Sequence, residues 1–583
     1  MMLYSYSYLI GMDAYRSVGN VLSAEAVEPQ TALFLRSSGR LINTLRFLLS
    51  FIVGKTLGLH RQKMSEKKDK QTAESTTGAE LGVGSVSSKH NAFRRMLHRR
   101  NDLDLLGKEM LQQSLQYDQA QLEADAIKVR RKLDFLVLPM MMTTYMLSFL
   151  DKQTLNYSNT YGLQEDTHMV NDDYSWVASA LYFGWLCGAW PWNLLLQRVA
   201  IGKLVGSMLF VWGLVCMLQA TVFNFGGFFV VRFFLGMLEG CISPAWVLLT
   251  SMLWTRREQT MRSSIWLCTN GVSNILGALL AYGSGRAQGL EIAQWKLIFL
   301  IVGALTFLWG FVILLYLPDG PHNAKMLTEY ERVVAVWRVS NNRIGLKDSK
   351  IKPYQIKEAL LDGKCYLLWI VAITLGILNG SVTTFMSAII KGFNFDALTT
   401  SLLQAPGGAF EVVSCLILGR ISQLPNMVGA TIVLGLLPVM AGLIGILTIP
   451  IEHRYALVAM CWMQNIIGSP IVLNWTVPGL NVAGHTKRMT VLGIYFVCFV
   501  VGNIIGPHLF LPTEVPRYAT AIKALLGTSC AGILFQSLYT LWCWIENRQR
   551  DKLGMHAEVL EEELLEGFED KTDKENKHFR YRL

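Results

Sequence analysis

Five charged side chains stand inside long apolar stretches of this sequence, and they are the residues best placed to do chemistry. Asp151 and Lys152 are adjacent in one stretch, Arg232 and Glu239 share a second, and Glu411 stands alone in a third. A charged side chain costs at least about 2.5–3.5 kcal/mol at the centre of a membrane helix, so few are kept there without a role. The set therefore predicts a buried polar site for ions or for an ionic ligand.

Glu239 is the leading candidate for proton chemistry. Arg232 and Glu239 are seven residues apart, which places both on one face of a helix about 10.5 Å apart along its axis. A carboxyl group held away from water resists ionisation, so it can load a proton on one side of a membrane and release it on the other. The alternative interpretation is a static charge pair between two helices.

Asp151 and Lys152 are neighbours in the sequence, so they point in different directions from one helix. Lys152 is a compact cation that can attract an anionic substrate. Asp151 can neutralise Arg232 or accept a proton. The alternative interpretation places both residues at the wet end of their helix, without a further role.

Glu411 and Gln404 form a candidate second polar site. Glu411 is either a second proton carrier or a hydrogen-bonding partner of a neighbouring helix, and the sequence supports both interpretations equally. Gln404 and Asn274 are polar residues of the kind that often joins helices inside a membrane. The isolated His485 and His508 predict no metal site, and the sequence indicates no cofactor. It contains no phosphate-binding loop and no nucleophile motif, so we expect neither an ATP-driven pump nor an enzyme.

Membrane-spanning helices are the elements that must position these residues. Of the 583 residues, 52% are hydrophobic and 16% are charged, whereas soluble domains carry about 25% charged residues. A span needs about 20 mostly apolar residues, and the sequence contains twelve such stretches. They cover approximately 133–157, 174–196, 203–222, 225–253, 263–284, 295–317, 365–391, 400–422, 427–450, 453–476, 489–511 and 518–545.

The predicted fold class is an all-α membrane protein with twelve transmembrane helices in two six-helix bundles. The first bundle covers residues 133–317 and the second covers 365–545, with a charged cytosolic linker at 318–364. Residues 1–132 form a mostly disordered N-terminal tail, and 546–583 a solvated C-terminal tail that includes the acidic run EVLEEELLEGFED. Residues 41–59 are apolar but interrupted by charges, which favours an interfacial or unstructured segment over a thirteenth span. One hypothesis makes Met64 the initiator and residues 1–63 a gene-model extension.

The distribution of basic residues predicts the orientation of the spans. Lys and Arg are enriched in the loops that share a side with the N-terminus, so both tails and the linker are expected in the cytosol. The net charge is +10, and a basic tail beside membrane spans indicates anionic lipid rather than nucleic acid as the partner. We expect a monomer in the plasma membrane.

The sequence from about 133 to 545 resembles the major facilitator superfamily, within it the anion:cation symporter family and its fungal allantoate permease branch. The resemblance rests on LDKQTLNY, RFFLGMLEGCISP, NGVSNILGALLAYG, NVAGHTKR and GNIIGP. It implies the two-bundle major facilitator fold, alternating access and proton-coupled uptake of small organic anions. By the same resemblance, Asp151 and Glu239 match proton-coupling carboxylates, and Lys152 matches the cation that meets the substrate carboxylate. Arg232 matches a neighbour of that network, and Tyr182 and Asn274 match substrate-contacting positions.

By the same resemblance, many family members outside fungi carry an arginine where this chain has Lys152. A lysine cannot bind a carboxylate through two parallel hydrogen bonds, so the contact with the anion is expected to be looser here. The leading hypothesis is a proton-coupled symporter for a carboxylate-bearing nutrient such as a ureide, a vitamin acid or a dipeptide. Two alternatives stay open, namely an exporter of a secondary metabolite and a membrane nutrient sensor with little transport.

Overall fold

The structure of the chain is a computed structural model. It describes residues 110–114, 116–196, 198–287, 289, 291–340, 352–515, 517–552, 571–576 and 579–583. In this part of the chain every regular element is a helix. The segment 41–59, Met64 and the acidic run EVLEEELLEGFED lie outside the described residues.

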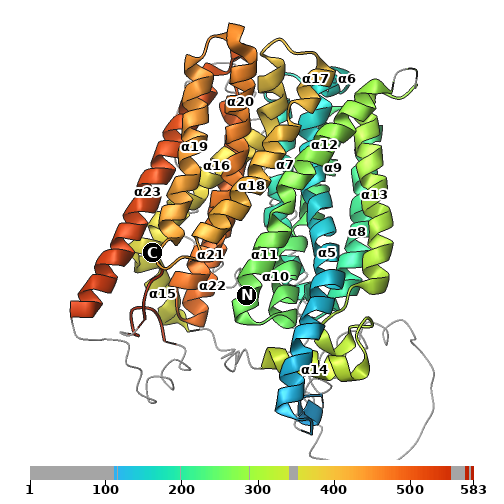
Figure 1. Ribbon diagram of the computed structural model, residues 1–583. Helices are drawn as coiled ribbons and strands as arrows, with labels where there is room; N and C mark the ends of the chain where they lie inside the picture. Colours follow the sequence, from blue (N-terminus) through green and yellow to red (C-terminus); the bar gives the residue numbers. More distant parts are fainter. Residues whose placement is uncertain are drawn as a thin grey trace, which may run out of the picture. The chain divides into compact units, whose positions relative to one another are not determined.

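Six spans make up the first half of the described chain, which is drawn from blue to green in Figure 1. The spans are α5 (Gln119–Thr160), α7 (Asp173–Leu196), α8 (Ile201–Leu218), α9 (Phe225–Glu239) with α10 (Ile242–Leu253), α11 (Arg256–Leu267) with α12 (Thr269–Arg286), and α13 (Gln294–Tyr316). Short elements join them, namely α6 (Leu163–Asp166) and the 3-10 turn η1 (Gln219–Thr221).

Six further spans make up the second half, drawn from yellow to red. They are α16 (Gly363–Lys391), α17 (Ala397–Leu402) with α18 (Ala405–Ile421), α19 (Val428–Thr448), α20 (Arg454–Gln464) with α21 (Gly468–Asn481), α22 (His485–Ile505) and α23 (Ala519–Lys552). The linker holds η2 (Pro321–Asn323), α14 (Glu329–Ser340) and α15 (Pro353–Leu361). The remaining 3-10 turns are η3 (Ile451–His453), η4 (Asn465–Ile467), η5 (Gly506–Leu509) and η6 (Pro512–Glu514).

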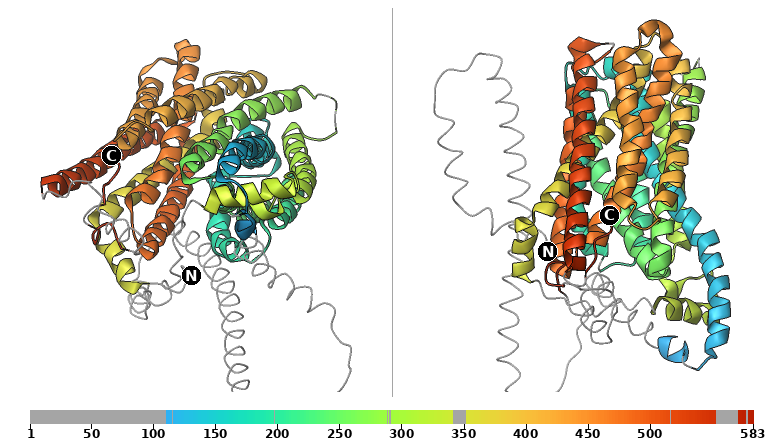
Figure 2. Two further views of the ribbon diagram at one scale, coloured as in Figure 1. Left: turned by 60° about the horizontal axis from the view of Figure 1, so that its bottom comes forward. Right: turned by 60° about the vertical axis from the view of Figure 1, so that its left-hand side comes forward.

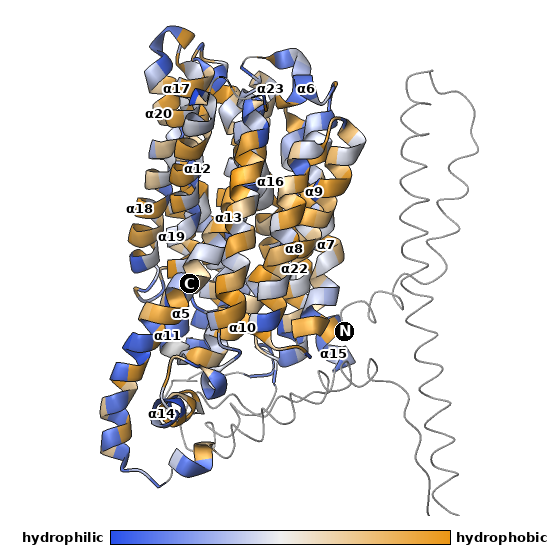
Figure 3. Cartoon of the chain, turned by 90° about the vertical axis from the view of Figure 1, so that its right-hand side faces the viewer, coloured by the Kyte–Doolittle hydropathy of each residue, from blue (hydrophilic) through white to orange (hydrophobic). Residues whose placement is uncertain are grey.

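The twelve predicted stretches all correspond to helices. By length and hydropathy, 11 helices of the described residues could cross a membrane. The stretch that does not meet this criterion is α7, because its many Trp, Tyr and Ser residues lower its mean hydropathy. Figure 3 shows hydrophobic residues along the spans and hydrophilic residues at the start of α5. The predicted all-α membrane fold is therefore confirmed.

The two ends of the bundles differ in what covers them. The tail side is the end where α5 begins, where α23 ends and where α14 and α15 lie; the far side carries α6 and α17 (Figures 1 and 2). On the tail side, α5 begins at Gln119 rather than near residue 133. This extension packs against α14, where Tyr330 donates a hydrogen bond to Asp125 at 3.1 Å and Lys132 pairs with Glu331. Part of the predicted N-terminal tail is thus an ordered helix.

Several spans are broken near mid-depth. The fourth span stops at Glu239 and resumes at Ile242, close to Pro244, and the tenth is interrupted by a 3-10 turn that begins at Asn465. Irregular backbone at membrane depth is tolerated where protein or a water-filled cavity surrounds it. In transporters such breaks often mark the binding site. The breaks therefore direct attention to Glu239 and Asn465.

Glycine allows α9 to approach α7 closely. A Cβ atom on Gly236 would lie 1.9 Å from the carbonyl oxygen of Leu181, so no larger residue fits there without a backbone shift. A Cβ atom on Gly240 would be less crowded, because its nearest neighbouring atoms would lie 3.6 Å away. The close contact fixes the helix that carries Arg232 and Glu239 against α7.

Hydrogen bonds between the two halves gather at the far side and at mid-depth. On the far side, the hydroxyl of Tyr174 donates to the carbonyl of Thr384 at 3.0 Å, and Ser175 donates to the carbonyl of Pro507 at 3.0 Å. Tyr161 and Ser401 share a further hydrogen bond of 2.9 Å. These contacts close the far side of the interface between the halves.

The C-terminal residues 571–576 and 579–583 dock onto the tail side of the second half, in contrast to the solvated tail that the sequence predicts. Asp573 lies 2.7 Å from the Nζ atom of Lys487, which also contacts Glu358 at 2.9 Å and Asp362 at 3.0 Å. The Lys487 side chain is fully buried. A buried cation needs partners of opposite charge, and the tail supplies one of the three.

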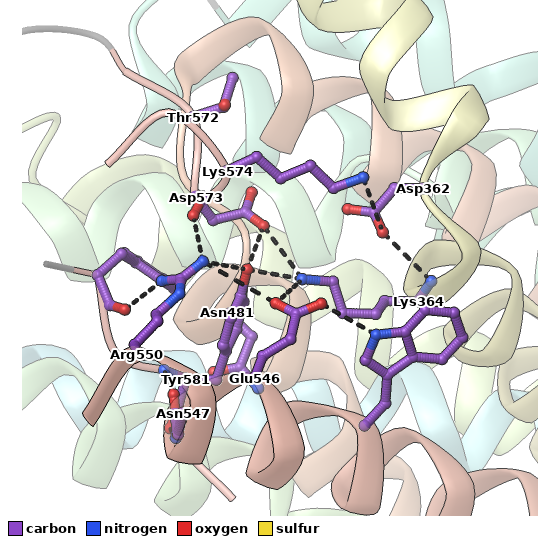
Figure 4. Close-up of polar contacts among 12 residues, drawn as sticks. Asp362, Lys364, Asn481, Glu546, Asn547, Arg550, Thr572, Asp573, Lys574 and Tyr581 are labelled. Carbon is purple, nitrogen blue, oxygen red and sulfur yellow. Dashed lines mark hydrogen bonds and ion pairs between the residues drawn. The ribbon is translucent and has the colours of Figure 1, made fainter. Parts of the chain in front are cut away.

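A second basic residue and the chain end complete this docking. Lys364 lies 2.8 Å from Glu546 and donates to the hydroxyl of Tyr581 at 2.6 Å (Figure 4). The amide of Val428 donates to the carbonyl of Leu583 at 2.7 Å. The tail thus ties together the tail-side ends of α16, α19, α22 and α23.

Candidate functional site

Lys152 and Glu239 form an ion pair inside the first half. The Nζ atom of Lys152, on α5, lies 2.8 Å from Oε1 of Glu239, the last residue of α9. The Glu239 side chain is 3% exposed and the Lys152 side chain 16%. Ser148, one turn before Lys152, donates a hydrogen bond of 2.5 Å to the same oxygen. The structure thus pairs the cation predicted in the first span with the carboxylate predicted in the fourth span.

An indole ring covers this ion pair. Trp185, on α7, donates from Nε1 to Oε2 of Glu239 at 3.2 Å. The Nζ atom of Lys152 lies 4.0 Å from the centroid of the same ring. A cation over an indole face gains electrostatic attraction, most strongly where water is excluded. Trp185 therefore contacts both members of the ion pair.

Asp151 points away from this pair, as adjacent residues on a helix must. Its carboxylate accepts a hydrogen bond from Nε1 of Trp212 at 2.8 Å and another from the thiol of Cys216 at 3.1 Å. Both donors lie on α8. Asp151 is 2% exposed, so neutral donors hold its carboxylate in a buried position.

Arg232 is buried between α5 and α13. Its Nη2 donates to Thr154 at 3.4 Å, and its guanidinium carbon lies 5.7 Å from the centroid of the Phe299 ring. The buried Nε atom has no hydrogen-bond partner. Arg232 is 1% exposed and so keeps an unused donor in the interior.

Tyr182 lies beside the ion pair and faces the second half. It is buried, its ring meets Trp185 edge-on with the centroids 5.8 Å apart, and its hydroxyl lies close to Thr383 of α16. The position matched by resemblance is therefore at the interface between the halves.

Asn274 and Glu411 meet across the same interface, away from Lys152. The Nδ2 atom of Asn274, on α12, donates to Oε2 of Glu411, on α18, at 2.8 Å, and approaches Oδ1 of Asn465 at 3.5 Å. The Glu411 side chain is buried. The backbones are close here as well, since a Cβ on Gly271 would lie 2.5 Å from the carbonyl oxygen of Gly408.

Gln404 belongs to a separate amide cluster nearer the far side. Asn156 donates to Oε1 of Gln404 at 2.9 Å, Gln404 donates to Ser387 at 2.9 Å, and the amide of Ser387 donates to Asn156 at 2.9 Å. These three residues close a ring of hydrogen bonds between α5 and the second half. Gln404 and Glu411 thus form their side-chain hydrogen bonds with different residues.

Sequence reasoning missed several residues that complete the site. Ser148 and Trp185 bind Glu239, and Trp212 binds Asp151. Ser148 stands four residues before Lys152, on the same helix face, and this spacing could have identified it. Nothing comparable distinguishes Trp185 among the tryptophans of α7. Within the described ranges, no group of three His, Cys, Asp or Glu residues could hold a metal ion.

Comparison with known families gives one match that covers most of the chain. The sequence profile described as Major Facilitator Superfamily matches residues 141–507. This range contains every residue of the two polar clusters described above.

Curated relatives cover a similar part of the chain. An uncharacterized transporter of Schizosaccharomyces pombe is 36% identical over 472 residues, which are 80% of this chain and 91% of the relative. The allantoate permease of Saccharomyces cerevisiae is 31% identical over 471 residues, 78% of this chain and 86% of the relative. Both names describe membrane transport.

Among solved structures, a bacterial homologue of the human lysosomal transporter Spinster has the same fold. The TM-score is 0.50 at 14% sequence identity, with 70% of this chain and 96% of the bacterial chain covered. At this identity the likeness concerns the fold alone.

Proposed function

The chain belongs to the Major Facilitator Superfamily, and we propose that this transporter carries a small organic anion across the membrane together with protons. The observation that carries the proposal is the ion pair of Lys152 and Glu239, which are 2.8 Å apart in a buried site. Its allantoate permease relative supports a carboxylate-bearing nutrient as the anion.

The ion pair supplies a way to couple the two cargoes. Lys152 cannot serve Glu239 and a substrate carboxylate equally well, because both compete for one ammonium group. A proton on Glu239 removes its charge and frees Lys152 for the substrate. Proton binding and anion binding then strengthen each other, and thermodynamic linkage makes this effect reciprocal. Loss of the substrate on the other side lets the pair re-form and expels the proton.

Arg232 adds positive charge to the same region. Its buried Nε atom has no hydrogen-bond partner, and its only described hydrogen bond is a long one to Thr154. A guanidinium with a free donor can accept a further anion or a rearranged Asp151. We therefore keep Asp151 and Arg232 in the proposal as the second charge pair, behind Lys152 and Glu239.

Alternating access fits the distribution of contacts between the halves. Hydrogen bonds from Tyr174 and Ser175 close the far side, whereas the tail side carries separate clusters on each half. We propose that the tail side faces the cytosol, as the basic loops predict, and that the protein acts in the plasma membrane. In this arrangement the described conformation is closed to the outside.

The test is proton movement in proteoliposomes that contain a pH-sensitive dye. A panel of allantoate, benzoate and a dipeptide is added outside at equal pH on both sides. The proposal predicts acidification of the lumen with at least one of these carboxylates, beyond that in protein-free vesicles. If no carboxylate moves protons faster than in the protein-free vesicles, anion–proton symport is wrong.

A further inference from the structure

Three aromatic rings line the interface between the halves directly beside the ion pair. Trp185 of α7 stacks on Phe496 of α22 with the ring planes 21° apart and the centroids 6.3 Å apart. Phe496 in turn meets Trp475 of α21 at 6.3 Å with the planes tilted by 58°. We call Trp185, Phe496 and Trp475 the aromatic wall. All three side chains are half-buried.

The wall crosses from one half of the molecule to the other. Trp185 belongs to the first half, whereas Phe496 and Trp475 belong to the second, and α7 packs against α22. Movement of the halves therefore changes the spacing of Trp185 and Phe496. A flat molecule that binds between or against these rings would be bound more tightly or released as the halves move.

The cation stands directly beside the wall. The Nζ atom of Lys152 lies 4.0 Å from the centroid of the Trp185 ring, so an anion bound to Lys152 lies near the aromatic rings. A long flexible spacer between the carboxylate and the body of the substrate would carry that body past the wall. The geometry favours a carboxylate attached directly to a flat body.

Resting on the proposed function, we propose that the transporter selects planar, conjugated carboxylates, with the carboxylate on Lys152 and the flat body against Trp185 and Phe496. Aromatic faces attract other π systems through their quadrupoles in offset or edge-on contacts, beyond the burial of apolar area. A saturated ring of similar size lacks a flat π face. The aromatic wall then discriminates between acids of equal charge and similar volume.

The test compares benzoate with cyclohexanecarboxylate, because both are C7 acids with one carboxylate on a six-membered ring. Equilibrium binding of each is measured by calorimetry on the full-length protein in detergent, without a proton gradient. Wild type should bind benzoate about 10-fold more tightly, the order expected from two aromatic contacts. In Phe496→Leu this ratio should fall below about 3-fold.

Phe311→Leu is the matched control, because the rings that Phe311 contacts among the described residues lie on α8 and α13 in the first half and Phe311 is 47% exposed. It should keep the wild-type ratio. The preference for planar carboxylates would be overturned by equal affinities of wild type for the two acids, by no binding of either acid, or by an unchanged affinity ratio in Phe496→Leu. Proton movement in the dye assay with a non-planar acid such as the dipeptide would leave symport standing while rejecting the planar class.

Discussion

The Nζ atom of Lys152 and Oε1 of Glu239 are 2.8 Å apart. The two residues are 87 positions apart in the sequence and belong to two helices that bring them together. The pair is shielded by Trp185 and by Ser148. A buried charge pair of this kind seldom adds stability over apolar residues of equal size, because desolvation offsets the attraction. Its retention is better explained by a role in transport than by a role in folding.

Removal of one partner of the ion pair should destabilise the protein more than removal of both. Lys152→Met leaves the Glu239 carboxylate buried without its cation, and breaking a buried pair costs about 3–5 kcal/mol. The double variant, Lys152→Met with Glu239→Gln, also removes the unpaired charge of Glu239. We therefore expect the double variant to melt at a higher temperature than Lys152→Met in detergent.

The exposed pair of Lys128 and Asp125 serves as the control for that experiment. Its lysine side chain is 75% exposed, so Lys128→Met should leave the melting temperature nearly unchanged. A double variant that melts below Lys152→Met would show that Lys152 and Glu239 do not compensate each other.

Gly236 should tolerate no side chain. A methyl group there would lie 1.9 Å from the carbonyl oxygen of Leu181, whereas one at Gly226 on the same helix would meet nothing within 4 Å. We expect Gly236→Ala to destabilise the protein by about 1–3 kcal/mol, as overpacking does. Gly226→Ala should leave the melting temperature unchanged or slightly higher. Equal melting temperatures for the two variants would contradict the close packing of α9 on α7.

The docked tail should be insensitive to pH over the physiological range. Burial raises the pKa of the Asp573 carboxyl, but the ammonium groups of Lys487 and Lys364 and the hydroxyl of Tyr581 together lower it further, so the pKa lies below its usual range. The stabilisation from Asp573 is thus present above the unfolded pKa of about 3.9 and is lost as the pH falls through the lower folded value. Hydrogen exchange at the Val428 amide, which donates to the carbonyl of Leu583, should show constant protection from pH 8 to pH 5 after correction for the intrinsic rate.

Asp573→Asn should remove that protection at every pH. Asp551→Asn is its control, because Asp551 is 52% exposed and pairs with Arg580 at the surface. Protection that disappears between pH 7 and pH 5 in wild type would mean that the tail is held by a group other than the Asp573 carboxylate.

Glu411 and Glu239 should respond differently to the same substitution. Glu411 accepts a hydrogen bond from Asn274 across the interface, and the carboxamide oxygen of a glutamine can accept it equally well. We expect Glu411→Gln to keep proton-driven uptake, and Glu411→Leu to slow it because Asn274 loses its acceptor. Uncoupled uptake in Glu411→Gln would instead make Glu411 a second proton carrier.

The sequence indicated the membrane fold and much of the polar site through local signals. Apolar stretches located the spans, and the spacing of Arg232 and Glu239 placed both side chains on the buried face of one helix. It did not say which residue of the first span pairs with Glu239. That choice depends on how α5 is rotated relative to α9. The close approach of Gly236 to α7 helps to set this rotation, and no local sequence pattern encodes it.

Other features depend on contacts between segments far apart in the chain. The early start of α5 follows from its packing on α14, and the docking of Asp573 follows from a buried Lys487 that lacks enough local partners. Composition alone made both segments resemble solvated tails. Gln404 and Glu411 share one helical segment but reach different clusters, because their separation of seven positions sets them two turns apart along α18.

The most direct test of the account is transport by Glu239→Gln in proteoliposomes, with whichever carboxylate moves protons in the dye panel. The glutamine imitates a permanently protonated Glu239 and leaves Lys152 free for the anion. The account predicts that this variant exchanges labelled for unlabelled substrate at a rate near wild type but does not accumulate substrate in response to an inward proton gradient. Accumulation equal to wild type would contradict the coupling role of the Lys152–Glu239 pair.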